Sequence, residues 1–166
     1  MGFINNLTKI NKIFMAIANK SYREELEEII DKDFLVIEDE NILILDGSSS
    51  YKGASFLEVV LPNCSYIGDS AFYNCKNLIK CTLPSCTCIG AYAFKNCNLL
   101  KEVSLPNCTS FYSSCFASCC NLISISLPEC TNIDKGMFNW CYKLKDVNIP
   151  QCTNIGSYAF GNCYNL

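Results

Sequence analysis

Residues 61–78 read LPNCSYIGDSAFYNCKNL, and related versions of this stretch follow four more times at intervals of 22 residues. All five prolines of the chain belong to the Leu-Pro or Ile-Pro pair that opens each copy. A repeat of this length is one coil, which buries its apolar side only by stacking on its neighbours. The sequence therefore predicts a solenoid over residues 34–166, with regular coils over residues 56–166. Three columns of equivalent residues keep the interval: Cys64/Cys86/Cys108/Cys130/Cys152, Cys75/Cys97/Cys119/Cys141/Cys163 and Phe72/Phe94/Phe116/Phe138/Phe160.

Each coil carries the pattern of a strand followed by a turn. Leu78, Cys81 and Leu83 have apolar counterparts in every later coil, and their alternation predicts a strand with one buried face. Proline ends this strand because it cannot donate a ladder hydrogen bond. We expect Gly68 and Gly90 to allow a tight bend or a positive φ, and a short helical or irregular segment to return the chain. These features predict an α/β solenoid with a parallel strand ladder on one face.

Fourteen cysteines in a chain of 166 residues would suggest a disulfide scaffold, but their spacing indicates otherwise. Ten of them recur once per coil, so equivalent cysteines should stack about 4.8 Å apart. Stacked residues have parallel Cβ vectors, whereas a disulfide needs a dihedral angle near roughly 90°. We interpret the columns as buried thiols that fill a narrow interior. Bonds between columns remain an alternative if the protein matures in an oxidising compartment.

The first third of the chain has a different pattern. Between Phe3 and Ile17 apolar residues recur three and four positions apart, which predicts an amphipathic helix. A second helix is expected to begin at Ser21, with a glutamate three residues later as a capping box. Because the first coil of a solenoid exposes its core edge, we interpret residues 1–33 as a helical N-terminal cap. The alternative is a helix for a partner or a membrane surface. Residues 34–55 are predicted to form a degenerate first coil.

The pattern Leu-Pro-Asn-Cys-x-x-Ile-Gly-x-x-Ala-Phe-x-x-Cys-x-x-Leu resembles the BspA-like, or Treponema-type, leucine-rich repeats. Such repeats occur in bacterial surface proteins and in expanded sets in some protists. The resemblance extends from Phe56 to Leu166, about two thirds of the chain. It implies a curved or gently twisted leucine-rich-repeat solenoid used for adhesion or protein recognition. It implies no enzymatic activity.

The residue types needed for common catalytic chemistry are missing. The chain has no histidine, so Ser-His-Asp and Cys-His arrangements cannot form. It contains no phosphate-binding loop and no dinucleotide fingerprint. The cysteines closest to a metal-binding pattern are Cys86-x-Cys88 and Cys119-Cys120, but these belong mostly to the core columns rather than to zinc knuckles. We therefore expect no catalytic residue, no metal site and no cofactor.

Charge and hydropathy narrow the range of partners. The chain has 13 basic and 16 acidic side chains and offers no basic stripe, so nucleic acid is not an expected partner. No apolar run approaches the roughly 20 residues of a transmembrane helix. The N-terminus has no clear signal peptide. We expect an intracellular or assembly-associated location rather than the cell surface.

Two groups of side chains are candidates for binding. The first lies on the outward face of the predicted strands. The alternative for this face is an ordinary solvated surface of mixed charge that binds no partner. The second is Trp140 with Tyr142. Small polar residues occupy the position of Trp140 in the other coils, so we expect an at least partly exposed aromatic of the kind enriched at binding hot spots. The alternative for Trp140 is packing against Tyr164. The candidate residues are Glu58, Lys80, Thr82, Glu102, Ser104, Ser124, Ser126, Trp140, Tyr142, Asp146 and Asn148.

Two functions agree with these features. The first is a non-enzymatic interaction or adhesion module that presents an extended surface to a protein or a glycan. The second is a structural subunit of a larger assembly, such as a virion, a cytoskeletal array or a cell-surface array. It would dock through its helices and through the open C-terminal edge at Leu166, because an unpaired edge invites association.

Overall fold

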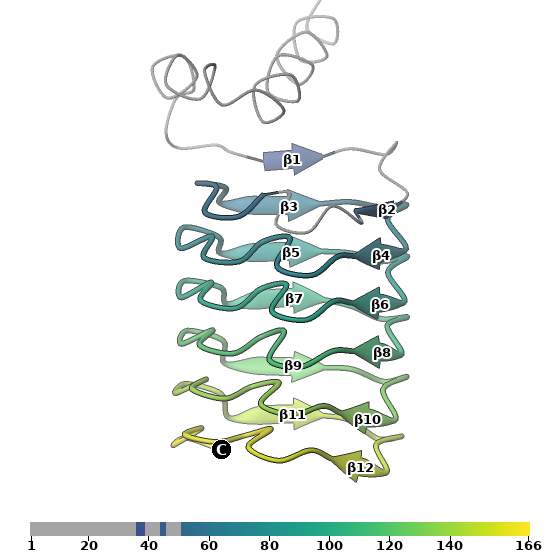
Figure 1. Cartoon of the computed structure of the whole chain (residues 1–166), viewed down its shortest axis with the longest axis vertical. Helices are drawn as coiled ribbons and strands as arrows, with labels where there is room; N and C mark the ends of the chain where they lie inside the picture. The colour runs from purple at the N-terminus through teal and green to yellow at the C-terminus, as the bar shows by residue number, and fades with distance from the viewer. Residues whose placement is uncertain (1–35, 39–43, 46–50) are drawn as a thin grey trace, which may run out of the picture.

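The computed structural model describes residues 36–38, 44–45 and 51–166, which stack into a solenoid of short coils (Figure 1). The predicted cap over residues 1–33 lies outside the described residues. The described part contains strands and turns and no helix. Its strands are β1 (Val36–Glu38), β2 (Ile44–Leu45), β3 (Glu58–Val60), β4 (Tyr66–Ile67), β5 (Lys80–Thr82), β6 (Cys88–Ile89), β7 (Glu102–Ser104), β8 (Ser110–Phe111), β9 (Ser124–Ser126), β10 (Asn132–Ile133), β11 (Asp146–Asn148) and β12 (Asn154–Ile155).

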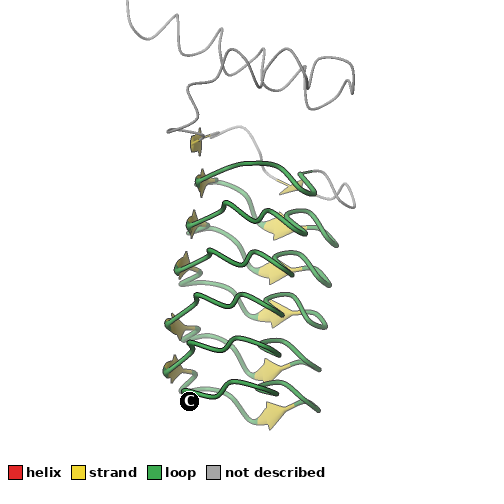
Figure 2. Cartoon of the chain, turned by 90° about the vertical axis from the view of Figure 1, so that its left-hand side faces the viewer, coloured by secondary structure: helices red, strands yellow, loops and turns green. Residues whose placement is uncertain are grey.

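All strand pairings are parallel and join residues 22 positions apart, such as Val59 with Cys81 and Ile67 with Ile89. The odd-numbered strands form a front ladder and the even-numbered strands form a back ladder, with turns between them (Figure 2). The predicted solenoid with a parallel front ladder is therefore confirmed. The back ladder was not predicted, because two strand residues per coil are too few to give an alternating pattern.

The α/β prediction was wrong for the described residues, because turns rather than helices return the chain. Alternate backbone amides in this segment bond in different directions. Phe72 N donates to Ala93 O of the next coil (2.8 Å), whereas Tyr73 N donates to Ser70 O of its own coil (3.0 Å). An α-helix needs successive amides bonded four residues back along the same chain. The amides that hold neighbouring coils together therefore cannot also form a helix.

Glycine has a different role in the turns from the one expected. Gly90 and Gly156 do not have positive φ angles. A Cβ atom at Gly90 would lie 2.6 Å from Asp69 N, so glycine is needed here for close approach between coils. The left-handed positions are instead two other columns, which hold Ser70/Tyr92/Ser114/Gly136/Tyr158 and Asn74/Asn96/Ser118/Trp140/Asn162.

A column of stacked aromatic rings runs through the core. Phe72, Phe94, Phe116 and Phe138 are fully buried, and successive ring centroids lie 5.1, 5.3 and 5.7 Å apart. Tyr51 extends the column, since its ring stacks on Phe72 at 5.4 Å. The sequence analysis missed Tyr51 because it precedes Phe72 by 21 residues rather than 22.

The cysteine columns form the predicted buried ladder, except in the last coil, where Cys152 and Cys163 are partly exposed. Their thiols also act as hydrogen-bond donors. Cys97 Sγ donates to Phe72 O of the preceding coil (3.2 Å), and Cys86 Sγ donates to Cys88 O (3.3 Å). Cysteine suits these positions because it is small and apolar yet carries a weak donor.

The buried cysteines should be unreactive in the folded protein. Burial raises the pKa of the Cys115 and Cys119 thiols well above the ordinary value, and only the thiolate attacks thiol reagents. Hydrogen bonds from neighbouring thiols lower the pKa of Cys75 and Cys86, but both side chains are inaccessible to solvent and are therefore shielded from the reagent. Titration of native protein with a disulfide reagent should therefore modify the partly exposed cysteines such as Cys88 and Cys120, and the others only after denaturation. If protein protected from air showed no free thiol by mass spectrometry, the alternative of disulfides between columns would be correct.

Candidate functional site

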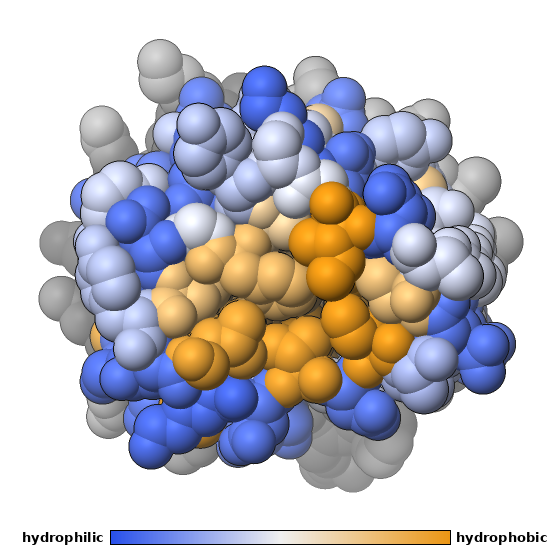
Figure 3. Space-filling model, turned by 90° about the horizontal axis from the view of Figure 1, so that it is seen from below, coloured by the Kyte–Doolittle hydropathy of each residue, from blue (hydrophilic) through white to orange (hydrophobic). Residues whose placement is uncertain are grey.

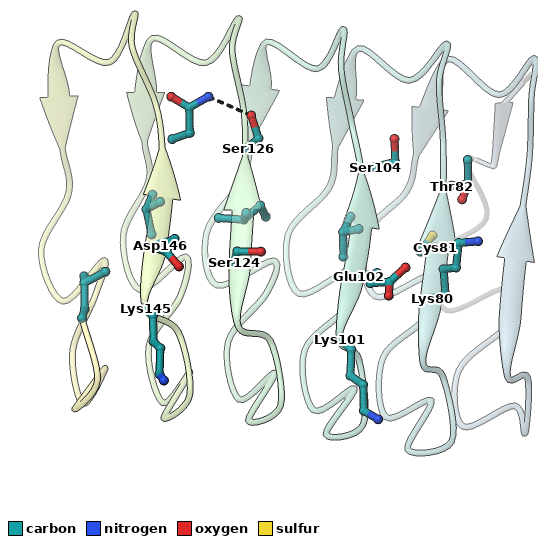
Figure 4. Close-up of a pocket in the computed structure, with 15 residues that line it drawn as sticks. Lys80, Cys81, Thr82, Lys101, Glu102, Ser104, Ser124, Ser126, Lys145 and Asp146 are labelled. Carbon is teal, nitrogen blue, oxygen red and sulfur yellow. Dashed lines mark hydrogen bonds between the residues drawn. The ribbon is translucent and has the colours of Figure 1, made fainter.

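The front ladder presents ordered rows of side chains to solvent. In the front strands from β3 to β11 the middle residue points into the core and its two neighbours point outward, as Lys80 and Thr82 do on either side of buried Cys81. Stacking repeats each position about every 4.8 Å. The outward residues of successive coils therefore align in rows along the solenoid (Figure 4).

These rows enclose a shallow, open depression of about 870 Å³, here called the strand-face groove. It spans β5 to β11 and collects eight of the predicted binding residues. Glu58, Trp140 and Tyr142 do not line it. The lining residues are Lys80, Cys81, Thr82, Lys101, Glu102, Val103, Ser104, Ser124, Ile125, Ser126, Lys145, Asp146, Val147, Asn148 and Leu166.

The groove offers hydroxyl, amide and charged groups. Asn148 Nδ2 donates to Ser126 Oγ (2.9 Å), and Lys80 Nζ lies 3.1 Å from Glu58 Oε1. Both members of this ion pair are partly exposed, so the pair contributes at most about 1 kcal/mol to folding. The remaining charged groups stay available to a partner.

The sequence analysis missed two lysines of the groove. Lys101 and Lys145 line it from the position just before the strand, where the neighbouring coils carry the exposed Ile79 and Ile123. The missed signal was an alternation of apolar and basic residues at the 22-residue interval.

The floor of the groove is apolar and chemically inert. It consists of inward residues of the front ladder, with Val103 partly exposed and Cys81 fully buried. Burial raises the pKa of the Cys81 thiol well above its ordinary value, which keeps it protonated. Among the described residues, no group of three or more cysteine or carboxylate side chains is placed to hold a metal ion. The groove is therefore suited to hydrogen bonding and charge pairing.

Trp140, Tyr142 and Tyr164 form a separate surface, here called the aromatic ridge. Trp140 is 42% exposed, as predicted, and packs at 76° against Tyr142 with ring centroids 5.8 Å apart. Tyr142 in turn stacks on Tyr164 at 5.7 Å. The indole is thus both accessible and packed, but its ring partner is Tyr142 rather than the Tyr164 of the alternative interpretation.

The backbone at Trp140 explains why other coils carry asparagine or serine there. Its φ is +66°, and its counterparts Asn96 and Ser118 have φ of +64° and +61°. The left-handed region suits asparagine but is unfavourable for a bulky residue. Tyr92 and Tyr158 are also bulky residues at positive φ, with values of 58° and 57°. The left-handed backbone is therefore a feature of the repeat, and Trp140 occupies one of its positions against local preference.

The last described coil exposes its apolar interior. Viewed from that end, apolar side chains gather at the centre and hydrophilic residues surround them (Figure 3). Ile155 and Leu166 are exposed here, and Phe160 is only partly buried. This apolar end face has the character of a surface on which another coil stacks.

Parallel ladders and a repeat of 22 residues define a leucine-rich-repeat solenoid. Residues 47–166 match the family model of the BspA type leucine rich repeat region in six copies, so the chain belongs to this family. No curated protein matches the chain significantly.

Two solved bacterial structures are similar to this chain. A leucine-rich repeat protein from Bacteroides ovatus is 31% identical with a TM-score of 0.70, over 79% of this chain and 35% of the other. A leucine rich cell surface protein from Faecalibacterium prausnitzii is 26% identical with a TM-score of 0.63, over 72% of this chain and 40% of the other. The chain thus spans well under half the length of either. In the described part of the chain, no helix is long and apolar enough to cross a membrane.

Proposed function

We propose that this chain is a non-enzymatic binding module that docks a protein partner in the strand-face groove. The observation that carries the proposal is the groove itself, a shallow surface that extends over four strands of the front ladder. Small-molecule sites are usually enclosed and bury most of their ligand. An open surface with mixed polar and apolar groups instead has the character of a protein interface.

The charges of the groove add specificity to this surface. Lys101 and Glu102, and again Lys145 and Asp146, place opposite charges side by side on neighbouring positions. A partner with matching charges would be oriented by them, because complementary charge sets register and association rate more than affinity. The similarity to a cell-surface protein of Faecalibacterium prausnitzii supports a binding role.

The aromatic ridge supplies a second point of contact. Exposed tryptophan and tyrosine side chains are enriched among residues that dominate binding energy. The 42% exposure of Trp140 leaves its ring accessible to a partner. We include Trp140 and Tyr142 in the proposed binding surface, apart from the groove.

The test compares partner capture by three forms of the protein. Wild type, the double variant Glu102→Lys with Asp146→Lys, and the control Glu129→Lys are immobilised and exposed to extract from the source cells and to a glycan array. All three positions are exposed, but Glu129 lies outside the groove. We expect wild type and control to capture the same protein and the double variant to bind it at least about tenfold more weakly, because close interfacial charge pairs couple by more than 1.4 kcal/mol.

The variant Trp140→Asn tests the ridge in the same assay. It restores the residue that Asn96 provides in another coil, so the fold should be retained, and loss of a hot-spot aromatic should weaken binding by at least about 2 kcal/mol. Capture of glycans alone, or equal capture by all variants, would contradict a protein-binding groove.

Assembly is the second candidate function, favoured by the apolar face of the last described coil (Figure 3). Light scattering on the same samples separates the two functions. Self-association of the wild type without capture of another protein would favour a structural subunit.

A further inference from the structure

Both ladders are interrupted between the coil of β7 and β8 and the coil of β9 and β10, an interface here called the seam. In the front ladder, β7 is paired with β5 but not with β9, which is paired with β11. In the back ladder, β8 is paired with β6 but not with β10, which is paired with β12. Among the described residues, the front-ladder bond from Leu105 N to Ser126 O is absent. Its counterparts are present: Leu61 N to Thr82 O (3.1 Å), Leu83 N to Ser104 O (3.0 Å) and Leu127 N to Asn148 O (2.9 Å).

The third side of the solenoid remains continuous across the seam. Here the turn amides of one coil still donate to carbonyl groups of the next, as in Phe116 N to Met137 O (3.0 Å) and Ser118 N to Asn139 O (2.7 Å). The rings of Phe116 and Phe138 lie 5.7 Å apart, wider than the 5.1 to 5.4 Å elsewhere in the phenylalanine column. The seam is thus open on two sides and closed on one.

The seam coincides with a change at the position where coils approach most closely, which holds Gly68, Gly90 and Gly156 but Tyr112 and Asp134 in the third and fourth coils. Gly90 N donates to Ile67 O at 2.7 Å, and the same bond from Tyr112 N to Ile89 O is 3.0 Å. The equivalent bond from Asp134 N to Phe111 O is absent from the described part of the chain. A Cβ atom at Gly156 would lie 2.7 Å from Lys135 N of the preceding coil. Tyr112 carries a Cβ at the same position and keeps its ladder bond, so substitution at Asp134 decides what part its Cβ plays in the seam.

The seam lies in the middle of the strand-face groove. The groove extends from β5 to β11 and includes residues on both sides of the interruption (Figure 4). Val103, which borders the seam, is partly exposed, whereas Val59 and Cys81 at the same position in regular coils are fully buried. The floor of the groove thus crosses the interruption, with Val103 on one side of it and buried Ile125 on the other.

We propose that the seam is a flexible joint at which residues 51–122 and 123–166 move as two blocks. The intact turn side serves as the hinge, and opening at the ladders widens the strand-face groove. In a repeat protein each coil is stabilised by its neighbours, so an interface that lacks ladder bonds opens before the others. The joint's use in admitting a partner rests on the proposed function, but the joint itself belongs to the free protein.

Amide hydrogen exchange, followed by NMR on the free protein, tests the joint. Amides without a ladder bond at a weak interface exchange through local opening. We expect Leu105 and Thr131 to exchange at least about tenfold faster than Leu83 and Thr153, after correction for intrinsic rates, since each of the latter pair donates a ladder hydrogen bond. If Leu105 and Thr131 were as protected as their counterparts, the ladders would be continuous and the joint would not exist.

Two substitutions at one position test the cause. Asp134→Gly removes the Cβ and should slow exchange at Leu105 and Thr131 by about tenfold as the ladder bonds form. Asp134→Ala also removes the carboxylate and its bond to Lys135 N but keeps the Cβ, so it should leave the fast exchange unchanged. Equal rates in the two variants would exclude the Asp134 Cβ as the cause. Because no partner is present, these outcomes are independent of whether the groove binds a protein.

Discussion

Replacing Phe94 with alanine is expected to lower the free energy of unfolding by about 3–5 kcal/mol, as for other fully buried aromatic residues. Phe94 is inaccessible to solvent, and its ring lies between those of Phe72 and Phe116 at 5.1 and 5.3 Å. Truncation leaves a cavity that faces a stacked ring on each side. Unfolding in urea, followed by circular dichroism, measures the loss.

Leu99→Ala is the matched control, because Leu99 belongs to the same coil but is exposed. Its truncation should change the free energy of unfolding by no more than about 0.5 kcal/mol. An unchanged urea midpoint for Phe94→Ala would mean that this column does not form the core.

Gly90→Ala is expected to destabilise the fold by about 1–3 kcal/mol, the usual effect of overpacking. The new methyl group would lie 2.6 Å from Asp69 N and 2.7 Å from Gly68 C. Both are backbone atoms, so the two coils must separate. The variant should lengthen the bond from Gly90 N to Ile67 O, which is 2.7 Å, toward the 3.0 Å of the equivalent bond from Tyr112 N to Ile89 O. Urea unfolding gives the free energy, and hydrogen exchange locates the change.

Gly161→Ala provides the comparison for Gly90. The nearest atom to its added methyl group is Asn139 Oδ1 at 2.8 Å, the end of a flexible side chain that can move. We expect a smaller loss of stability than for Gly90→Ala. Equal losses in both variants would show that close backbone approach is not what glycine provides at position 90.

The regular interval predicted the solenoid, its core columns and the front ladder, since stacking makes equivalent residues share an environment. It did not predict the back ladder or the absence of helix in the described residues. Ser70 and Asn74 have positive φ angles that prevent a continuous helix, but serine and asparagine are common enough in helices and loops to hide this. Tyr51 was missed because the interval shortens by one residue.

For the candidate site, the sequence identified the outward strand residues, and the structure places eight of them around one groove. Trp140 and Tyr142 were also predicted as a group separate from the strand face, and neither residue lines the groove. The seam was missed. Tyr112 and Asp134 replace glycine in the sequence, but their effect depends on a contact between coils that only the three-dimensional structure shows.

The thiol bonds between coils have a consequence for how such a chain can change in length. Cys119 Sγ donates to Phe94 O, and Cys141 Sγ to Phe116 O, each 25 residues back. Between the first described coil and the next, the same bond spans 24 residues, from Cys75 Sγ to Tyr51 O, and the rings of Tyr51 and Phe72 still stack at 5.4 Å. A one-residue change in length is thus absorbed within a single coil, whereas insertion or deletion of a complete coil leaves every such distance unchanged. The molecule can therefore lengthen or shorten by whole repeats, which extends the strand ladders by the same steps.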